Sequence, residues 1–119
     1  MFLAPHGALC GTLLAPVMAA NLRALRERHS ASFALVRYTG IACVLTDSIS
    51  ATADDGVAWV QALARSLRIP GLTEMGVDAT TFGRVASQAA SASSMKANPI
   101  ELTQAELVTV LAQADLGQQ

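Results

Sequence analysis

The chain has 119 residues, of which 8 are basic, 9 are acidic and 52% are hydrophobic, and its formal net charge is −1. This length allows one domain and excludes a two-domain enzyme that carries its own nucleotide-binding half. The small net charge excludes a basic surface for nucleic acid. Charged residues make up 14%, against roughly 25% in ordinary soluble domains, so the chain is not disordered and has an excess of apolar surface.

An apolar run over residues 9–17 makes the start of the chain similar to a signal peptide with a cleavage site near Ala19. The first basic residue is Arg23, so the positive segment that opens a signal peptide is missing. The run is also shorter than the roughly 20 residues of a membrane span. We expect a cytoplasmic protein without membrane contact, and a secreted helical protein is the alternative. Cys10 and Cys43 are isolated in apolar context, which favours buried free thiols.

Five segments have helical periodicity, and none has the alternation of a strand. They cover about residues 7–28, 32–45, 53–67, 79–92 and 104–116. The first segment is apolar over so much of its circumference that we expect it to be buried on more than one side. The 23 alanines favour closely packed helices over a sheet. The sequence therefore predicts a single all-α domain over residues 1–119, an orthogonal bundle of about five helices.

Two helix starts have capping sequences. Thr103 followed by Glu106 predicts a capping box for the last helix. Asp54 and Asp55 look like a catalytic carboxylate pair, but they directly follow Thr52, a good N-cap residue. Their position indicates acidic charges in the first turn of a helix, a structural role.

His6 is the strongest candidate for chemistry, since it opens the most apolar helix. Cys10 lies four residues later on the same face, so the two side chains form half of a possible metal site. No second pair of ligands accompanies them, because the only other histidine, His29, lies at a basic helix end. Taken alone, the pattern favours a histidine at a helix start beside a core cysteine.

The remaining candidates are weaker. Ser94 and Lys96 share a loop and suggest a serine–lysine nucleophile, but no oxyanion-hole motif lies near them. The glycines are scattered, with neither a G-x-G-x-x-G nor a P-loop pattern, so the chain carries no phosphate cradle of its own. Tyr38 and Trp59 fall within apolar faces and are predicted to be core residues.

A series of motifs resembles one known family. The series is Pro5-His6-Gly7, Leu13-Leu14, Pro16-Val17-Met18 and Asn21, followed by Asp54–Trp59, Leu67–Leu72, Ser93–Pro99 and Leu102-Thr103. It is similar to iron-containing (group III) alcohol dehydrogenases, whose signature reads P-H-G, L-L-P-x-V-M and F-N with the same interval from histidine to asparagine. The chain departs from this signature at Ala15, a usual proline position, and at Ala20, where an aromatic residue is common.

The resemblance implies a two-domain dehydrogenase, of which this chain is the C-terminal segment. The family has an α/β nucleotide-binding domain and a helical domain of the dehydroquinate synthase-like type, with a divalent metal, iron or zinc, held by one aspartate and three histidines. His6 matches the last of these histidines, and the other ligands and the NAD(P) loop would precede residue 1. The implied reaction is metal-assisted hydride transfer between NAD(P) and a small alcohol or aldehyde.

The resemblance also places Ser94, Met95 and Lys96 in a loop that lines the substrate pocket. Since the chain has one metal ligand and no nucleotide site, we expect it to be inactive alone. The alternative is a freestanding all-α interaction module or homo-oligomer without catalysis. In either case we expect a homo-oligomer, since residues 8–20 contain no charge and the first helix should expose a contiguous apolar surface.

Overall fold

The computed structural model describes residues 6–90 and 98–116 of the chain, and the side chains of residues 10–88 and 98–115. Its helices are α1 (His6–Arg28), α2 (Phe33–Thr46), α3 (Ala53–Ser66), a short 3₁₀ turn η1 (Ala79–Thr81), α4 (Phe82–Ala90) and α5 (Gln104–Leu116). The described residues contain no strand. The predicted all-α bundle of about five helices is confirmed.

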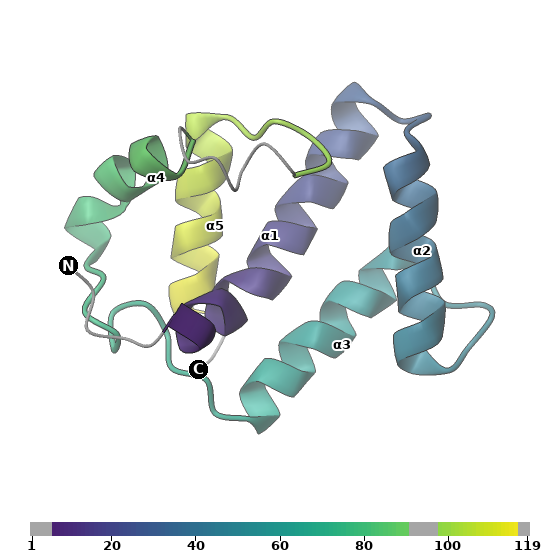
Figure 1. The fold of residues 1–119 in the computed structure, drawn as a ribbon, viewed down its shortest axis with the longest axis horizontal. Helices are drawn as coiled ribbons and strands as arrows, with labels where there is room; N and C mark the ends of the chain where they lie inside the picture. The colour runs from purple at the N-terminus through teal and green to yellow at the C-terminus, as the bar shows by residue number, and fades with distance from the viewer. Residues whose placement is uncertain (1–5, 91–97, 117–119) are drawn as a thin grey trace.

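Helix α1 lies in the middle of the molecule (Figure 1). The α2–α3 pair packs along one side of it, and α5 packs along the other with α4 beyond. The expectation that the first helix is buried on more than one side is confirmed, because α1 contacts α2, α3 and α5.

The main hydrophobic core fills the space among α1, α4, α5 and the loop before η1. Its buried members are Ala20, Ala24, Leu25, Leu72, Met75, Val77, Phe82, Ala86, Ile100, Leu102, Leu107, Val110, Leu111 and Ala114. The alanines of α1 and α5 leave little side-chain bulk between the two helices. A polar contact also lies in this junction, from the Thr12 hydroxyl to the carbonyl of Ala114 at 3.2 Å.

Small residues also bring α2 and α3 together. A Cβ built on Gly56 would lie 2.9 Å from the Cβ of Ala42, closer than two carbon atoms pack comfortably. The start of α3 has the N-cap predicted at Thr52, and Asp55 completes a capping box there by accepting a hydrogen bond from the Thr52 amide. Asp54 pairs with Arg26 of α1 at 2.9 Å and ties the two helices at the surface. The structural roles predicted for both acids are confirmed.

Three sequence-based expectations on burial are wrong. Cys10 is exposed, and Cys43 is only partly buried. Trp59 is 38% exposed, at the edge of α3. Leu14 is the only exposed large apolar side chain among residues 10–28 of α1, so this described part of the helix lacks the contiguous apolar surface that was predicted. Such a surface occurs instead on α2, whose exposed residues include Phe33, Val36, Ile41 and Val44.

The helix boundaries agree with the prediction to within a few residues, except at the fourth helix. There Asp78 caps η1 by accepting a hydrogen bond from the Thr80 amide at 2.9 Å, and the α-helical hydrogen bonds begin only at Phe82. None of the helices in the described residues combines the length and the hydropathy that a membrane crossing requires.

Candidate functional site

His6 is the first residue of α1, as the motif Pro5-His6-Gly7 suggested. Its imidazole lies outside the side chains that the structure describes, and so do the whole of Ser94, Met95 and Lys96. The structure therefore tests none of these four side chains directly. It does describe how the segment after residue 97 is held against α1.

Asn21 and Asn98 form a reciprocal amide pair. The Asn21 amide donates to the Asn98 side-chain oxygen at 3.0 Å, and the Asn98 amide donates back at 2.7 Å. The second hydrogen of the Asn21 amide goes to the hydroxyl of Tyr38 on α2 at 2.9 Å. Asn21 is 2% exposed, so these hydrogen bonds replace the water that its amide loses on folding.

The same pair shapes the turn that follows. The second hydrogen of the Asn98 amide goes to the carbonyl of Ile100 at 2.7 Å, while the Ile100 side chain is buried in the core. Asn98 is therefore hydrogen-bonded both to Asn21 of α1 and to the turn that follows it. Ser94 precedes it by four residues, a length of chain that spans at most about 14 Å.

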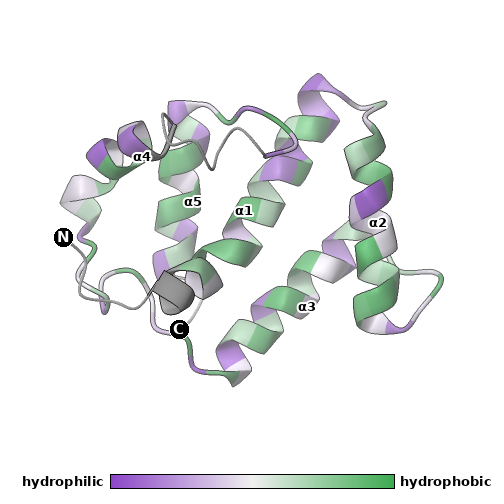
Figure 2. Ribbon diagram, in the orientation of Figure 1, coloured by the Kyte–Doolittle hydropathy of each residue, from purple (hydrophilic) through white to green (hydrophobic). Residues whose placement is uncertain are grey.

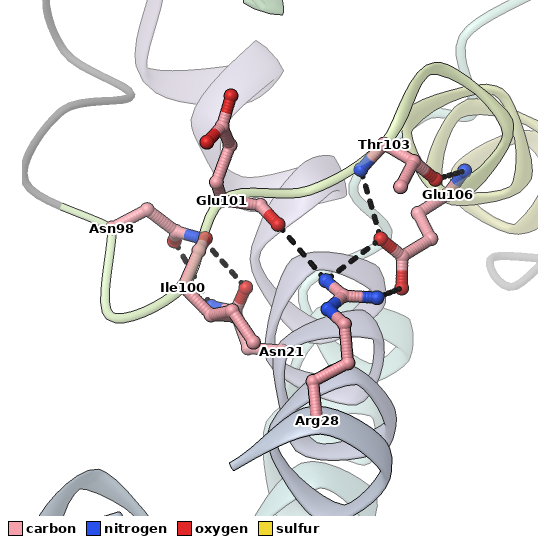
Figure 3. Close-up of polar contacts among 7 residues, drawn as sticks. All are labelled: Asn21, Arg28, Asn98, Ile100, Glu101, Thr103 and Glu106. Atoms are coloured by element: carbon pink, nitrogen blue, oxygen red, sulfur yellow. Dashed lines mark hydrogen bonds and ion pairs between the residues drawn. The ribbon is translucent and has the colours of Figure 1, made fainter.

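Arg28 holds the next part of this segment from the last turn of α1. Its guanidinium donates to the Glu101 carbonyl at 2.9 Å and to both carboxylate oxygens of Glu106 at 3.1 and 3.2 Å (Figure 3). Glu106 in turn accepts from the Thr103 amide at 2.8 Å, and its own amide donates to the Thr103 hydroxyl at 3.1 Å. The capping box predicted for the last helix is confirmed, and it is joined to α1 through Arg28.

Charge stabilises this arrangement. Partial burial of the Glu106 carboxyl raises its pKa, but hydrogen bonds from Arg28 and from the Thr103 amide lower the pKa by more. The net result is a pKa below the ordinary glutamate value, so the carboxylate stays ionised and keeps both partners at neutral pH. We call the two anchors together, Asn21–Asn98 and Arg28–Glu106, the α1 clamp.

The comparison with protein families identifies the chain. The model of the Fe-containing alcohol dehydrogenase family, C-terminal, matches residues 1–115. The chain belongs to this family. The comparison with curated proteins gave no match, and neither did the comparison with solved structures.

The alcohol dehydrogenase family is metal-dependent by its description, so the donor groups of this chain can be tested for a metal site. Among the described residues, no three histidine, cysteine, aspartate or glutamate side chains group together. Asp54 is occupied by Arg26, whose hydrogen bond holds the pKa of that carboxyl below its usual value. The described residues therefore do not make a metal site by themselves.

Two of the surface hollows in the described part of this family domain lie beside residues named above. One, of about 310 Å³, lies beside the α1 clamp and is lined by Arg28, His29 and residues 100–103. The other, of about 420 Å³, lies at the start of α3 beside Trp59 and Asp55. Neither contains a residue that the sequence singled out for metal or substrate binding.

Sequence reasoning missed the α1 clamp. No partner was predicted for Arg28. Tyr38 was predicted to be a core residue and does pack against the core, but the hydrogen bond from Asn21 to its hydroxyl was not predicted. One residue indicated the clamp. Asn21 is a polar side chain at the end of the apolar part of α1, and a buried amide there requires hydrogen-bond partners. The resemblance included both Asn21 and Asn98, but the sequence does not say that they meet.

Proposed function

We propose that the chain is the C-terminal helical part of a metal- and NAD(P)-dependent alcohol dehydrogenase that interconverts a small alcohol and its aldehyde or ketone. The observation that carries the proposal is the family match, which extends over residues 1–115 and includes the motif Pro5-His6-Gly7. The metal would supply Lewis acidity toward the substrate oxygen, and NAD(P) would supply or accept the hydride.

His6 is the proposed metal ligand of this chain. A helix start is a suitable place for it, because the helix fixes the backbone of its first turn. One imidazole does not make a four-coordinate site. The remaining ligands and the nucleotide loop must then come from outside residues 1–119, and we assign no step of the reaction to this chain alone.

The α1 clamp gives a physical basis for the proposed substrate loop. Ser94, Met95 and Lys96 lie a few residues before Asn98, which is hydrogen-bonded to the same helix that begins with His6. A loop tethered in this way adopts fewer positions, so less conformational entropy is lost when a substrate orders it. We infer that the clamp is a positioning device that holds Asn98, just after this loop, against α1.

Complementation tests this proposal. A family dehydrogenase from which the segment equivalent to residues 1–115 has been deleted is mixed with the 119-residue chain, iron or zinc, NAD(P) and a series of small alcohols. We expect hydride transfer from the mixture, none from either piece alone and none with His6→Ala. The deleted relative's own segment, added separately, is the positive control. Restoration by that segment but not by this chain would refute the proposal.

The second candidate, a freestanding interaction module without catalysis, is favoured by one observation. The apolar surface of α2 is exposed, as expected of a helix that binds another protein. Metal analysis separates the two candidates: the dehydrogenase proposal expects the complemented mixture to retain metal that His6→Ala loses. If the chain is a freestanding module, the mixture should retain no metal that depends on His6.

A further inference from the structure

Tyr38, Asn21 and Asn98 join three parts of the fold that are far apart in the sequence. Tyr38 lies in α2, Asn21 lies in α1, and Asn98 is at the start of the described segment that leads to α5. Tyr38 is the only tyrosine of the chain, and Asn21 and Asn98 are its only asparagines. Each of these side chains can therefore be followed in solution without interference from another residue of its type.

The hydrogen bonds of this network fix the orientation of both amides. The carbonyl of Ile100 can only accept, so the Asn98 amide nitrogen must face it, at 2.7 Å. The other Asn98 hydrogen goes to the Asn21 side-chain oxygen, and Asn21 donates back (Figure 3). Reversing either amide alone would place two oxygens and two nitrogens against one another. The Asn21 amide therefore has one hydrogen left, which the Tyr38 hydroxyl accepts at 2.9 Å.

The surroundings of Asn21 offer little water to replace the Tyr38 hydroxyl. Asn21 is 2% exposed, and its chain neighbours Ala20 and Leu22 are also buried. Tyr38 packs against the hydrophobic core, and Figure 2 shows hydrophobic residues along much of α1 and α2. Without the hydroxyl, one buried N–H of Asn21 has no acceptor, which is costly. The amide would have to rotate or shift to find one, and that movement disturbs its pairing with Asn98.

We propose that Tyr38 is a positioning residue for the proposed substrate loop, because its hydroxyl holds the Asn21 amide in the orientation that pairs with Asn98. This inference rests on the proposed function, since the loop meets a substrate only in the complete enzyme. Tyr38 acts through Asn21 and is assigned no contact with the substrate.

The same hydrogen bond makes the α2–α3 hairpin part of the support for the loop. Helix α2 packs mainly against α3, so its position relative to α1 depends on few side chains, of which Tyr38 is one. The orientation of Asn21 is then linked to the docking of the hairpin. Sequence positions 38 and 98 are coupled in this way without a direct hydrogen bond between them.

Hydrogen exchange at the asparagine side chains of the 119-residue chain tests the orientation step. Isotope labelling of asparagine alone makes only Asn21 and Asn98 visible by NMR. Tyr38→Phe keeps the ring and removes only the hydroxyl. The Asn98 side-chain hydrogens should then exchange with water about three- to tenfold faster, although Tyr38 does not hydrogen-bond to them.

Thr46→Val is the matched control for this measurement. Thr46 lies on the same helix, and its hydroxyl donates to the Ala42 carbonyl at 2.8 Å, outside the network. The substitution also removes one hydroxyl hydrogen bond at nearly constant side-chain shape. It should leave the exchange of the Asn98 side-chain hydrogens unchanged.

Kinetics of the complemented dehydrogenase mixture test the role in the reaction. A loosened loop weakens binding of the substrate and of the transition state alike, so Tyr38→Phe should raise KM by about three- to tenfold while kcat stays within about twofold. A change that only reduced the folded fraction would lower the amount of active enzyme, and therefore kcat, at constant KM. Thr46→Val should keep the KM of the unmodified chain.

The outcomes separate this inference from the proposed function. Asn98 exchange rates that Tyr38→Phe leaves unchanged, or that Thr46→Val raises equally, would overturn the inference, and so would an unchanged KM in an active mixture. An unmodified chain that restores no activity where the relative's own segment does would refute the proposed function. The exchange rates would then still decide whether Tyr38 orients Asn98.

Discussion

The close crossing of α2 and α3 can be tested with a single methyl group. Gly56→Ala adds a carbon 2.9 Å from the Cβ of Ala42 and 3.1 Å from its Cα. Carbon atoms pack best at about 3.5–4.0 Å, so one helix must move by several tenths of an ångström. Ala42 is fully buried and its backbone belongs to a helix, so neither atom can turn aside as a flexible side chain would.

The expected loss follows from two opposing effects. Overpacking of a core typically costs about 1–3 kcal/mol. Replacement of glycine by alanine inside a helix returns about 0.5–1 kcal/mol. We therefore expect Gly56→Ala to reduce the free energy of unfolding by up to about 2.5 kcal/mol, and a loss near the middle of that range lowers the melting temperature by roughly 5 °C in a domain of this size.

Urea unfolding followed by circular dichroism, at a concentration where the chain is monomeric, measures this change. Gly83→Ala is the matched control, because Gly83 lies in α4 and has no atom within 4 Å of its ideal Cβ position. That variant should gain stability. Ala42→Gly should partly rescue Gly56→Ala. Equal gains from Gly56→Ala and Gly83→Ala would show that the two helices do not cross as closely as described.

Three further predictions concern the α1 clamp. Thr103→Ala should cost about 1 kcal/mol, and a double-mutant cycle with Glu106→Ala should be non-additive, since both residues belong to one capping box; simple additivity in urea unfolding would contradict the box. Asn21→Ala leaves the Asn98 amide short of partners and should cost about 1–3 kcal/mol, after which Asn98→Ala should add little. The folded-state pKa of Glu106 lies below the ordinary 4.5, so its contribution to stability is complete above pH 4.5 and is lost as the pH falls further. In Arg28→Met, the free energy of unfolding should therefore fall less steeply as the pH is lowered below 4.5. A slope equal to that of the unmodified chain would contradict the pairing.

The fold was largely predictable because its signals are local. Periodicity placed five helices, and capping residues such as Thr103 fixed where two of them begin, because a cap depends on three or four neighbouring residues. The burial of Trp59 and Cys10 was not predictable, since it depends on which neighbour a helix face receives. The apolar surface expected on the first helix lies on α2 instead, because α1 is enclosed by helices from both sides.

The candidate site was predictable only in part. His6 and Ser94 were found through family motifs, and both side chains lie outside those that the structure describes. The pairing of Asn21 with Asn98 joins residues 77 positions apart, and no local pattern encodes such a contact. The partner of Arg28 was missed for the same reason: a charge at a helix end looks solvated until the tertiary fold brings Glu106 to it.

The central position of α1 also determines which helices can separate from the core by local unfolding. The α2–α3 hairpin is built mainly from contacts between its own two helices, and it meets the core formed by α1, α4 and α5 along one side of α1. A hairpin attached in this way can detach as a cooperative unit while that core stays folded. Amide hydrogens of α2 and α3 should then exchange with solvent together, and earlier than those in the buried half of α1. The Tyr38–Asn21 hydrogen bond would break in each such opening, so Asn21 would keep its hydrogen bonds to Asn98 but lose the one that joins it to α2.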